Sequence, residues 1–179
     1  HWRSFIGSVP DIFEQEGKEI YNKRNLIKVL TAPDGTAVNV KRYHVPHGPN
    51  RLVYSWGIRK PKCQRAFDYP MILKNKGIET PEPIAIIEER SWLGLLGYSY
   101  LITMQCDYGH TLYEVGDAKA GTYETLAKAL AHFAVKIHNG NVLHKDFTPG
   151  NVLWKQDDEG FHFSLVDINR MHFGQVSAK

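Results

Sequence analysis

The first third of the chain alternates between apolar and polar positions in a way that is typical of short β-strands. Apolar residues at 20–21 and an alternating stretch at 26–30 flank the polar residues 22–25, which predicts a β-hairpin. A second turn signal, Pro-Asp-Gly-Thr, occupies 33–36, and residues 37–43 alternate again. The pattern therefore predicts three consecutive strands.

The third of these strands carries a lysine at a position of chemical interest. Because side chains alternate along a strand, we expect Lys41 on the face opposite to Val38 and Val40. Ahead of the strands, the pattern predicts a short helix over 11–17, with Asp11 as its cap and a glycine at its end.

The middle of the chain combines a helix with two further strands. Residues 62–76 have a helical distribution of apolar positions, which Pro70 interrupts and a glycine follows. Apolar runs at 84–88 and 98–105 predict a pair of strands. We therefore expect a sheet of about five strands, mostly antiparallel, together with one main helix.

After residue 108 the pattern becomes helical. Residues 122–138 carry apolar side chains at three- and four-residue spacings, which predicts an amphipathic helix. Shorter apolar segments at 152–154 and 161–166 flank a polar turn and predict a hairpin. The expected fold class is α+β.

Length and composition limit the possible classes of protein. The chain has 179 residues, enough for one ordinary domain or two small lobes, and its 42% hydrophobic and 23% charged residues are typical of a folded protein. No apolar run approaches the roughly 20 residues needed to span a bilayer. Cys63 and Cys106 are far apart and without metal-like spacing, so we expect reduced thiols in a cytoplasmic protein.

The net charge of +3 is unevenly distributed. Between 41 and 62 there are six Lys or Arg residues and no acid, with tyrosines and a tryptophan among them. This stretch is either a solvated loop or a surface for an anionic substrate or an anionic membrane. No nucleic-acid-binding motif accompanies it, so we expect no nucleic acid partner.

Residues 144–151 read His-Lys-Asp-Phe-Thr-Pro-Gly-Asn, and an Asp-Ile-Asn sequence begins at Asp167. Phosphoryl transfer requires a carboxylate near the acceptor hydroxyl, oxygen ligands for Mg²⁺ and positive charge near the phosphates. Asp146 fits the first requirement, Asn151 with Asp167 the second, and the strand residue Lys41 the third.

These residues carry a resemblance to a known family. The chain resembles the lipopolysaccharide core kinases, the relatives of heptose and Kdo kinases that share the protein-kinase-like fold. The resemblance spans nearly the whole chain and is carried by 38–41, 65–69, 77–83, 144–153 and 167–170. It implies a bilobal fold with an N-lobe over 1–105 and a mostly helical, partial C-lobe over 106–179, because family members usually continue with further helices.

The resemblance also implies ATP and Mg²⁺ as cofactors. Asp146 would be the catalytic base, and Asn151 and Asp167 would hold the metal ion. His144 would brace the loop from beneath. The Asp-Phe-Gly motif of the family reads Asp167-Ile168-Asn169 here, so the carboxylate is kept and the glycine hinge is lost.

The nucleotide would also contact residues of the first lobe. Lys41 would pair with the α- and β-phosphates and be held by Asp68 on the helix. Adenine would meet backbone groups around Gln105 and Cys106. The chain has no glycine-rich loop in the first hairpin, so the residues 22–25 would cover the phosphates with side-chain charge, or serve only as a polar turn.

The acceptor is predicted less directly. Thr148 stands where serine/threonine protein kinases usually carry a lysine, and the stretch 42–62 is basic and contains aromatic residues. Both features favour an anionic sugar or glycolipid acceptor, with peripheral contact at the cytoplasmic face of the inner membrane. Two alternatives stay open: phosphate transfer to another small hydroxylated acceptor, such as an aminoglycoside or choline, and a nucleotide-binding regulatory module without catalysis.

Overall fold

The chain forms two compact units in the computed structural model, which describes residues 1–23, 25–116 and 118–175. The first unit contains 1–68 and 82–106, and the second contains 69–81 and the residues from 107 onward. We expected 69–81 in the first lobe, whereas these residues make their contacts within the second unit. The helix α3 (Lys62–Asn75) has its first part in one unit and its second half in the other.

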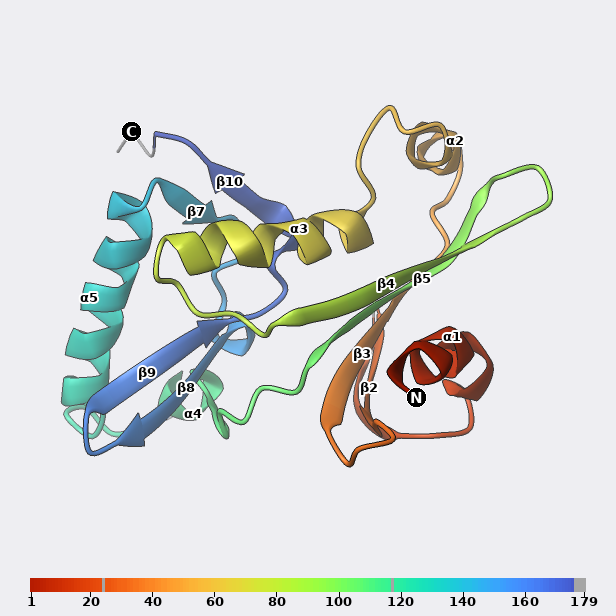
Figure 1. Ribbon diagram of the computed structural model, residues 1–179. Helices are drawn as coiled ribbons and strands as arrows, with labels where there is room; N and C mark the ends of the chain where they lie inside the picture. Colours follow the sequence, from red (N-terminus) through yellow and green to blue (C-terminus); the bar gives the residue numbers. More distant parts are fainter. Residues whose placement is uncertain (24, 117, 176–179) are drawn as a thin grey trace. The chain divides into compact units, whose positions relative to one another are not determined.

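The first unit is built on an antiparallel sheet of five strands in the order β1-β2-β3-β5-β4 (Figure 1). Its elements are α1 (Trp2–Ile12), β1 (Lys18–Asn22), β2 (Leu26–Thr31), β3 (Ala37–Tyr43), α2 (Pro49–Ser55), the start of α3, β4 (Pro83–Arg90) and β5 (Leu96–Met104). The expected hairpin, third strand and pair of later strands are confirmed.

The two faces of this sheet pack against different partners. Val38 and Val40 of β3 belong to a buried cluster that includes Val9 and Phe13 from the α1 side. Tyr43, on the same strand, instead joins a smaller cluster with Cys63 of α3. The alternation predicted for β3 is therefore confirmed, and Lys41 shares the face of Tyr43.

The first helix differs from the prediction. α1 begins at Trp2 and ends at Ile12, so Asp11 lies in its last turn and does not cap its start. Its apolar residues recur at three- and four-residue spacing and pack against the sheet. The prediction started from a capping signal and a glycine, and it overlooked this apolar periodicity upstream.

The buried side chain of Lys28 donates hydrogen bonds to the backbone of the segment that follows α1. The Nζ of Lys28 donates to the carbonyl oxygens of Phe13 at 2.7 Å, Glu14 at 3.1 Å and Glu16 at 3.3 Å. Backbone carbonyls of a turn have no partner in a helix or sheet, and one ammonium group can donate to all three. Lys28 therefore fastens the segment after α1 to strand β2.

The basic stretch contains a helix that the sequence did not predict. α2 starts at Pro49, directly after Gly48 with a φ of 54°, and ends at Ser55. A proline suits the first turn of a helix, because its missing N–H has no partner there anyway. None of the residues of α2 is buried. Because the helix buries no side chain, its sequence has no apolar periodicity from which it could be predicted.

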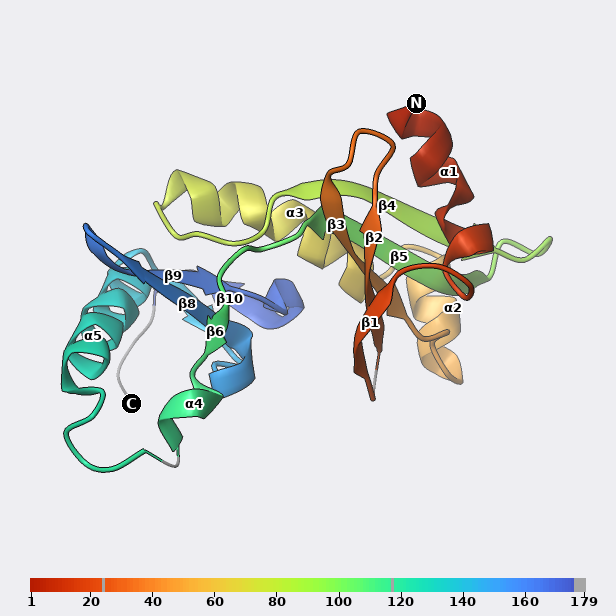
Figure 2. The same ribbon diagram turned by 90° about the horizontal axis from the view of Figure 1, so that it is seen from below.

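The second unit combines helices with short strands (Figure 2). Its elements are the end of α3, β6 (His110–Thr111), α4 (Tyr113–Gly116), α5 (Glu124–Asn139), β7 (Val142–His144), η1 (Pro149–Asn151), β8 (Val152–Asp157), β9 (Gly160–Leu165), η2 (Ile168–Arg170) and β10 (Met171–Phe173). The strands form a three-stranded sheet, β6-β8-β9, and a β10-β7 pair. The predicted amphipathic helix and C-terminal hairpin are confirmed.

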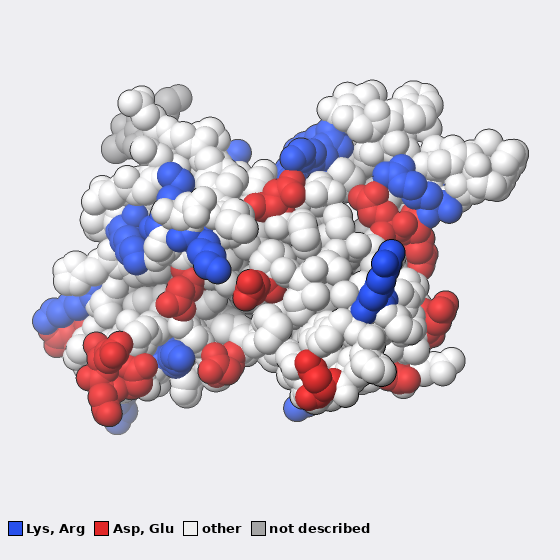
Figure 3. All heavy atoms as spheres, viewed as in Figure 1, with Lys and Arg blue, Asp and Glu red and all other residues white. Residues whose placement is uncertain are grey.

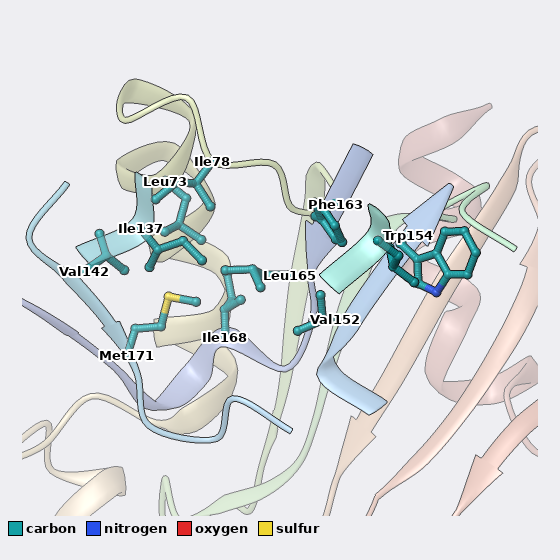
Figure 4. Packing of buried hydrophobic residues seen from close by; sticks show 11 residues of the cluster. Leu73, Ile78, Ile137, Val142, Val152, Trp154, Phe163, Leu165, Ile168 and Met171 are labelled. Atoms are coloured by element: carbon teal, nitrogen blue, oxygen red, sulfur yellow. The ribbon is translucent and has the colours of Figure 1, made fainter. Parts of the chain in front are cut away.

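One core holds the second unit together. Leu73 from α3 and Ile137 from α5 pack with Val152 and Leu165 of the hairpin and with Ile168 of η2, as Figure 4 shows. This core fixes the ends of β8 and β9, from which the candidate site residues extend. No helix in the described part of the chain is both long enough and apolar enough to cross a bilayer.

Candidate active site

The segment between β7 and β8 is a tight loop stabilised by backbone hydrogen bonds. The amide of Thr148 donates to the carbonyl of Asp146 at 2.8 Å, and the amide of Asn151 donates to Thr148 at 2.9 Å. Lys145 donates to the carbonyl of Arg170 at 3.3 Å, next to the β7–β10 pair. The loop is therefore anchored both to itself and to the segment that follows Asp167.

His144 fixes this loop from the interior. Its side chain is 4% exposed, its Nδ1 accepts the amide of Asp146 at 3.2 Å, and its Nε2 lies 3.1 Å from the carbonyl of Val166. Because Nδ1 accepts a hydrogen bond, Nε2 carries the proton and the ring is neutral. Burial lowers the pKa of His144, against the raising effects of Val166, Asp146 and Asp167.

The carboxylate of Asp146 is held by an arginine to which the sequence assigned no role. Arg170 Nη1 donates to Asp146 Oδ1 at 2.9 Å. The side chain of Asp146 is 30% exposed and that of Arg170 is 58% exposed. One carboxylate oxygen thus has a fixed cationic partner near the surface, which orients the group. The only signal in the sequence was the position of Arg170 within the stretch that resembles the kinases.

Asn151 and Asp167 come together at one end of the β8–β9 hairpin. Val152 pairs with Leu165, and the amide of Val166 donates to the carbonyl of Asn151 at 3.0 Å. The Nδ2 of Asn151 donates to the backbone carbonyl of Asp146 at 2.9 Å. The fold of the second unit therefore brings Asp146, Asn151 and Asp167 together in one cluster of loops.

The backbone at Asp167 is unusual. Its φ and ψ are 53° and 47°, a left-handed conformation that few residues other than glycine adopt. Asn169, which is 6% exposed, donates from Nδ2 to Asp167 Oδ1 at 2.6 Å. The asparagine that replaces the expected glycine is thus a buried donor that orients the carboxylate.

The donor atoms of this cluster suit a magnesium ion that is shared with a phosphate. The Nδ2 of Asn151 is used for the loop, so its Oδ1 is the atom that suits a metal ion, and Asp167 supplies a carboxylate. Mg²⁺ is commonly held by one or two such oxygens together with phosphates and water. Among residues 1–23, 25–116 and 118–175, no group of three or more His, Cys, Asp or Glu residues could hold a metal ion. The cluster therefore suits an ion whose ligands come partly from phosphates and water, and not one that is held by protein side chains alone.

Lys41 lies at the centre of the sheet in the first unit. It pairs with Ile27 on one side and with Leu101 on the other, and its side chain is 8% exposed. Its Nζ lies 5.1 Å from the ring centroid of Tyr43, within the range of a cation–π interaction. The positive charge is therefore held in place on one face of the sheet.

The thiol of Cys63 reports on the surroundings of Lys41. Burial, helped by the charge of Glu88 and opposed by that of Lys41, raises the pKa of Cys63 to about 12. Cys63 is therefore an unreactive thiol, in agreement with the reduced cysteines expected from the sequence. Glu88 is a second acid, beside Asp68, in this part of the first unit, and sequence reasoning did not identify it.

Asp68 is bonded to residues other than the lysine we expected. Lys60 Nζ donates to Asp68 Oδ2 at 2.9 Å, and Gln64 Nε2 donates to Oδ1 at 2.9 Å. Desolvation raises the pKa of Asp68, but the bonds from Lys60 and Gln64 outweigh it, so that the pKa lies below its usual value. The expected partner of Asp68, Lys41, is replaced by a lysine from the segment that leads into α3.

Gln105 and Cys106 directly follow strand β5, which ends at Met104, one residue earlier than predicted. The amide of Gln105 donates to Ala37 at 3.2 Å, and its side chain is bonded to Asn39 at 3.1 Å and to the carbonyl of Cys106 at 3.1 Å. The segment is thus tied to β3. Of the covering turn 22–25, Arg24 lies outside the described residues, and Asn22 is bonded to Glu19 at 3.3 Å.

A comparison with protein families decides the membership of this chain. The sequence model of the Lipopolysaccharide kinase (Kdo/WaaP) family matches residues 16–175, which is most of the chain. The chain belongs to the lipopolysaccharide kinase (Kdo/WaaP) family. A comparison with curated proteins found no match.

This member of the lipopolysaccharide kinase family has the same fold as several kinases of known structure. The Rio2 kinase of Chaetomium thermophilum, solved as an ADP/Mg²⁺-phosphoaspartate complex, has a TM-score of 0.63 and 15% identity, and WaaP in complex with acyl carrier protein has 0.56 and 16%. The MAP kinase LmaMPK10 of Leishmania major has a TM-score of 0.50 and 15% identity. The fold is protein-kinase-like, as predicted.

The family member described here corresponds to part of these kinases. The Rio2 and MAP kinase matches each cover 94% of the chain, and the WaaP match covers 98%. The chain spans 52% of the Rio2 chain, 50% of the MAP kinase chain and 71% of the WaaP chain. About half of each protein kinase that it resembles therefore lies outside the matched region.

Proposed function

We propose that this chain carries the nucleotide-binding and catalytic residues of a kinase that transfers the γ-phosphate of ATP to a sugar hydroxyl of the lipopolysaccharide core. The observation that carries the proposal is the cluster of Asp146, Asn151 and Asp167 at one end of the β8–β9 hairpin. These residue types are what phosphoryl transfer requires. Membership of the Kdo/WaaP family supports the acceptor class.

In this proposal Asp146 accepts the proton of the attacking hydroxyl. Arg170 occupies Oδ1, which directs Oδ2 toward the acceptor. His144 holds the backbone of Asp146 through a bond that only the neutral ring can make in this geometry. A positioned carboxylate contributes to the rate by orientation as well as by proton transfer.

Asn151 and Asp167 hold Mg²⁺ in the same proposal. The metal ion would neutralise negative charge on the nucleotide phosphates. Asn169 keeps the carboxylate of Asp167 in one orientation through its buried amide. The ADP and Mg²⁺ of the similar Rio2 kinase complex support these cofactors.

Lys41 pairs with the α- and β-phosphates, and the backbone of Gln105 and Cys106 receives adenine. Since the amide of Gln105 is bonded to Ala37, the adenine contacts rest on its carbonyl oxygen and on the amide of Cys106. In the structure Asp68 is bonded to Lys60 and Gln64. We therefore propose Asp68 as a residue that pairs differently with and without nucleotide.

The acceptor is proposed to be an anionic glycolipid at the cytoplasmic face of the inner membrane. The basic residues between 41 and 62 supply the positive charge for such a ligand. Thr148 in place of the lysine of protein kinases agrees with a sugar rather than a peptide hydroxyl.

The proposal is tested by the variant Asp146→Asn in the full-length protein. We expect phosphate transfer to a core oligosaccharide to fall by about 10²–10⁴-fold, while ATP still raises the melting temperature. Asp158→Asn, at an exposed turn residue, is the matched control and keeps the wild-type rate. Transfer by Asp146→Asn at the rate of the control would refute the assignment of the base. An acceptor panel with aminoglycosides and choline would correct the substrate class.

A nucleotide-binding regulatory module is the second candidate. The observation in its favour is that Asp68 is bonded to Lys60. Stabilisation by ATP and Mg²⁺ without turnover on any acceptor would support this alternative, and turnover would exclude it.

A further inference from the structure

Two exposed apolar segments of the first unit have no role in the proposed chemistry. Trp56 and Ile58, just after α2, are 70% and 72% exposed. Trp92 and Leu93, at the tip of the β4–β5 hairpin, are 92% and 61% exposed. Tryptophan is usually well buried, so two tryptophans and two aliphatic residues in solvent indicate a surface that is covered in use.

Hydrogen bonds hold these two segments next to each other. The amide of Leu96 donates to Ser55 Oγ at 2.8 Å, and Arg51 Nε donates to the carbonyl of Leu96 at 2.8 Å. Arg90 Nη1 bonds to the carbonyls of Ser55 at 3.3 Å and Gly94 at 3.1 Å. The end of α2 is thus attached to the base of the hairpin, and both lie at the same end of the sheet in Figures 1 and 2.

Cations follow the first of these segments directly in the sequence. Arg59, Lys60 and Lys62 follow Ile58 closely, and of these Lys60 is bonded to Asp68 at 2.9 Å. Glu88, an acid at the base of the hairpin, is bonded to Arg90 at 2.8 Å. Figure 3 shows an uncharged hairpin tip with both Lys or Arg and Asp or Glu side chains at its base.

We propose that these two segments form a docking surface for a bilayer that contains anionic lipid. The docking surface consists of Trp56, Ile58, Trp92 and Leu93, with the nearby cations around it. Tryptophan partitions into the region of the headgroups, where its ring meets apolar chains and its N–H meets water. Lysine and arginine next to such residues bind the negative surface potential of the leaflet.

The shape of the docking surface favours a membrane over a protein partner. Its apolar residues are at a hairpin tip and at the end of a helix without buried residues, and both project into solvent. A stable protein interface needs a broad complementary area, whereas projecting side chains can insert between lipid headgroups one by one. The docking surface would bring the chain to a glycolipid acceptor, yet lipid binding itself requires no phosphate transfer, so it can be tested separately.

The first experiment is flotation of the full chain with vesicles of phosphatidylethanolamine and phosphatidylglycerol. We expect the double variants Trp92→Ser/Leu93→Ser and Trp56→Ser/Ile58→Ser each to lower the partition coefficient by about tenfold, because each removes apolar area from the bilayer. Val135→Ser, at an apolar residue of α5 that is 55% exposed, is the matched control and binds like the wild type. Unchanged binding of both double variants overturns the proposal.

The second experiment separates charge from apolar insertion. Replacing Arg59 and Lys62 with Gln should weaken binding to the anionic vesicles by about fivefold for each cation removed, and leave the weaker binding to phosphatidylcholine vesicles unchanged. An equal loss on both kinds of vesicle, or no loss, contradicts an electrostatic contribution from the docking surface.

The third experiment asks whether the tryptophans themselves enter the lipid. Brominated phosphatidylcholine mixed with phosphatidylglycerol should quench the fluorescence of the wild type, and this quenching should be lost in Trp56→Phe/Trp92→Phe while vesicle binding persists. If quenching persists in that variant, insertion occurs elsewhere and the docking surface is wrong. If the chain binds no vesicles and instead self-associates through Trp92, the surface contacts protein and the membrane proposal fails.

Discussion

Two lysines on neighbouring strands of the first unit lie on opposite faces of the same sheet and have different surroundings. Lys28 pairs with Val40, and Lys41 pairs with Ile27, so the two positions are diagonal neighbours. Both side chains are 8% exposed. The Nζ of Lys28 is bonded to three backbone carbonyls after α1, whereas the Nζ of Lys41 lies over the ring of Tyr43 on the other face.

This difference shows how one residue type acquires two roles. A lysine whose donors are taken up by the carbonyls of a turn stabilises the fold, and it cannot bind a ligand without losing those hydrogen bonds. The ammonium group of a lysine beside an aromatic ring is attracted to that ring, which keeps its charge on one face of the sheet. Burial alone therefore does not separate a structural lysine from a candidate ligand-binding one.

The largest effect is expected when the lysine on the α3 face is changed. Lys41→Met should lower phosphate transfer by about 10²–10³-fold, because it removes the positive charge that we propose for the phosphates, and should abolish stabilisation by ATP and Mg²⁺. Transfer assays and thermal shifts measure both effects. Lys28→Met is the matched control, and loss of the nucleotide response in that variant instead would reverse the assignment of the two lysines.

A glycine next to Lys28 gives the next largest effect. Gly17 has a φ of 84°, and a Cβ there would lie 2.8 Å from the carbonyl oxygen of Val29. Gly17→Ala should therefore lower the free energy of unfolding by about 3 kcal/mol, measured in urea.

The control for this prediction lies in helix α1. A Cβ added at Gly7 would have no atom within 4 Å, so Gly7→Ala should raise stability by about 0.5–1 kcal/mol. If both variants are equally stable, the backbone after α1 is not constrained as the structure indicates.

Removal of the structural lysine is expected to have an intermediate effect. Lys28→Met leaves the carbonyls of Phe13, Glu14 and Glu16 without their shared donor, which should cost about 2 kcal/mol of unfolding free energy. Nucleotide-dependent stabilisation should stay unchanged. Lys18→Met, on the exposed strand β1, is the control with little change. A stability equal to that of the control would show that water replaces the ammonium.

The smallest effect concerns pH and the second unit. Burial lowers the pKa of His144 from its ordinary value of 6.5, so the folded protein keeps the ring neutral while the unfolded chain takes up a proton below that pH. His144 therefore contributes stability that is present above pH 6.5 and is lost as the pH falls toward its folded pKa. Between about pH 7 and pH 5, unfolding free energies of the wild type should decrease more than those of His144→Gln. Parallel pH curves would contradict this.

Much of the fold could be predicted from the sequence because the relevant patterns are local. Strands β2 and β3 and helix α5 follow from spacings of two and of three to four residues. α1 was misplaced because a capping signal was given more weight than the apolar spacing that begins at Trp2. α2 was missed because it buries nothing and thus leaves no periodic pattern.

The candidate site was predictable to different degrees in the two units. Asp146, Asn151 and Asp167 were found because a short loop and one hairpin connect them, so sequence spacing constrains their separation. The pairing of Asp68 was not predictable, since it depends on how the residues before α3 place Lys60. Arg170 and Asn169 were missed as partners of the two carboxylates for the same reason.

Residue order and chemistry were enough to identify the strands of the first unit, the β8–β9 hairpin, the helices α3 and α5, the family and the loop cluster of Asp146, Asn151 and Asp167. Each of these rests on short-range spacing or on a motif. The partner of each charged side chain was settled by packing: Lys28 by the end of α1, Asp68 by Lys60 and Asp146 by Arg170. Such pairs join residues that lie far apart in the sequence or on separate elements. Their free energy depends on burial and distance, which exist only once the chain has folded.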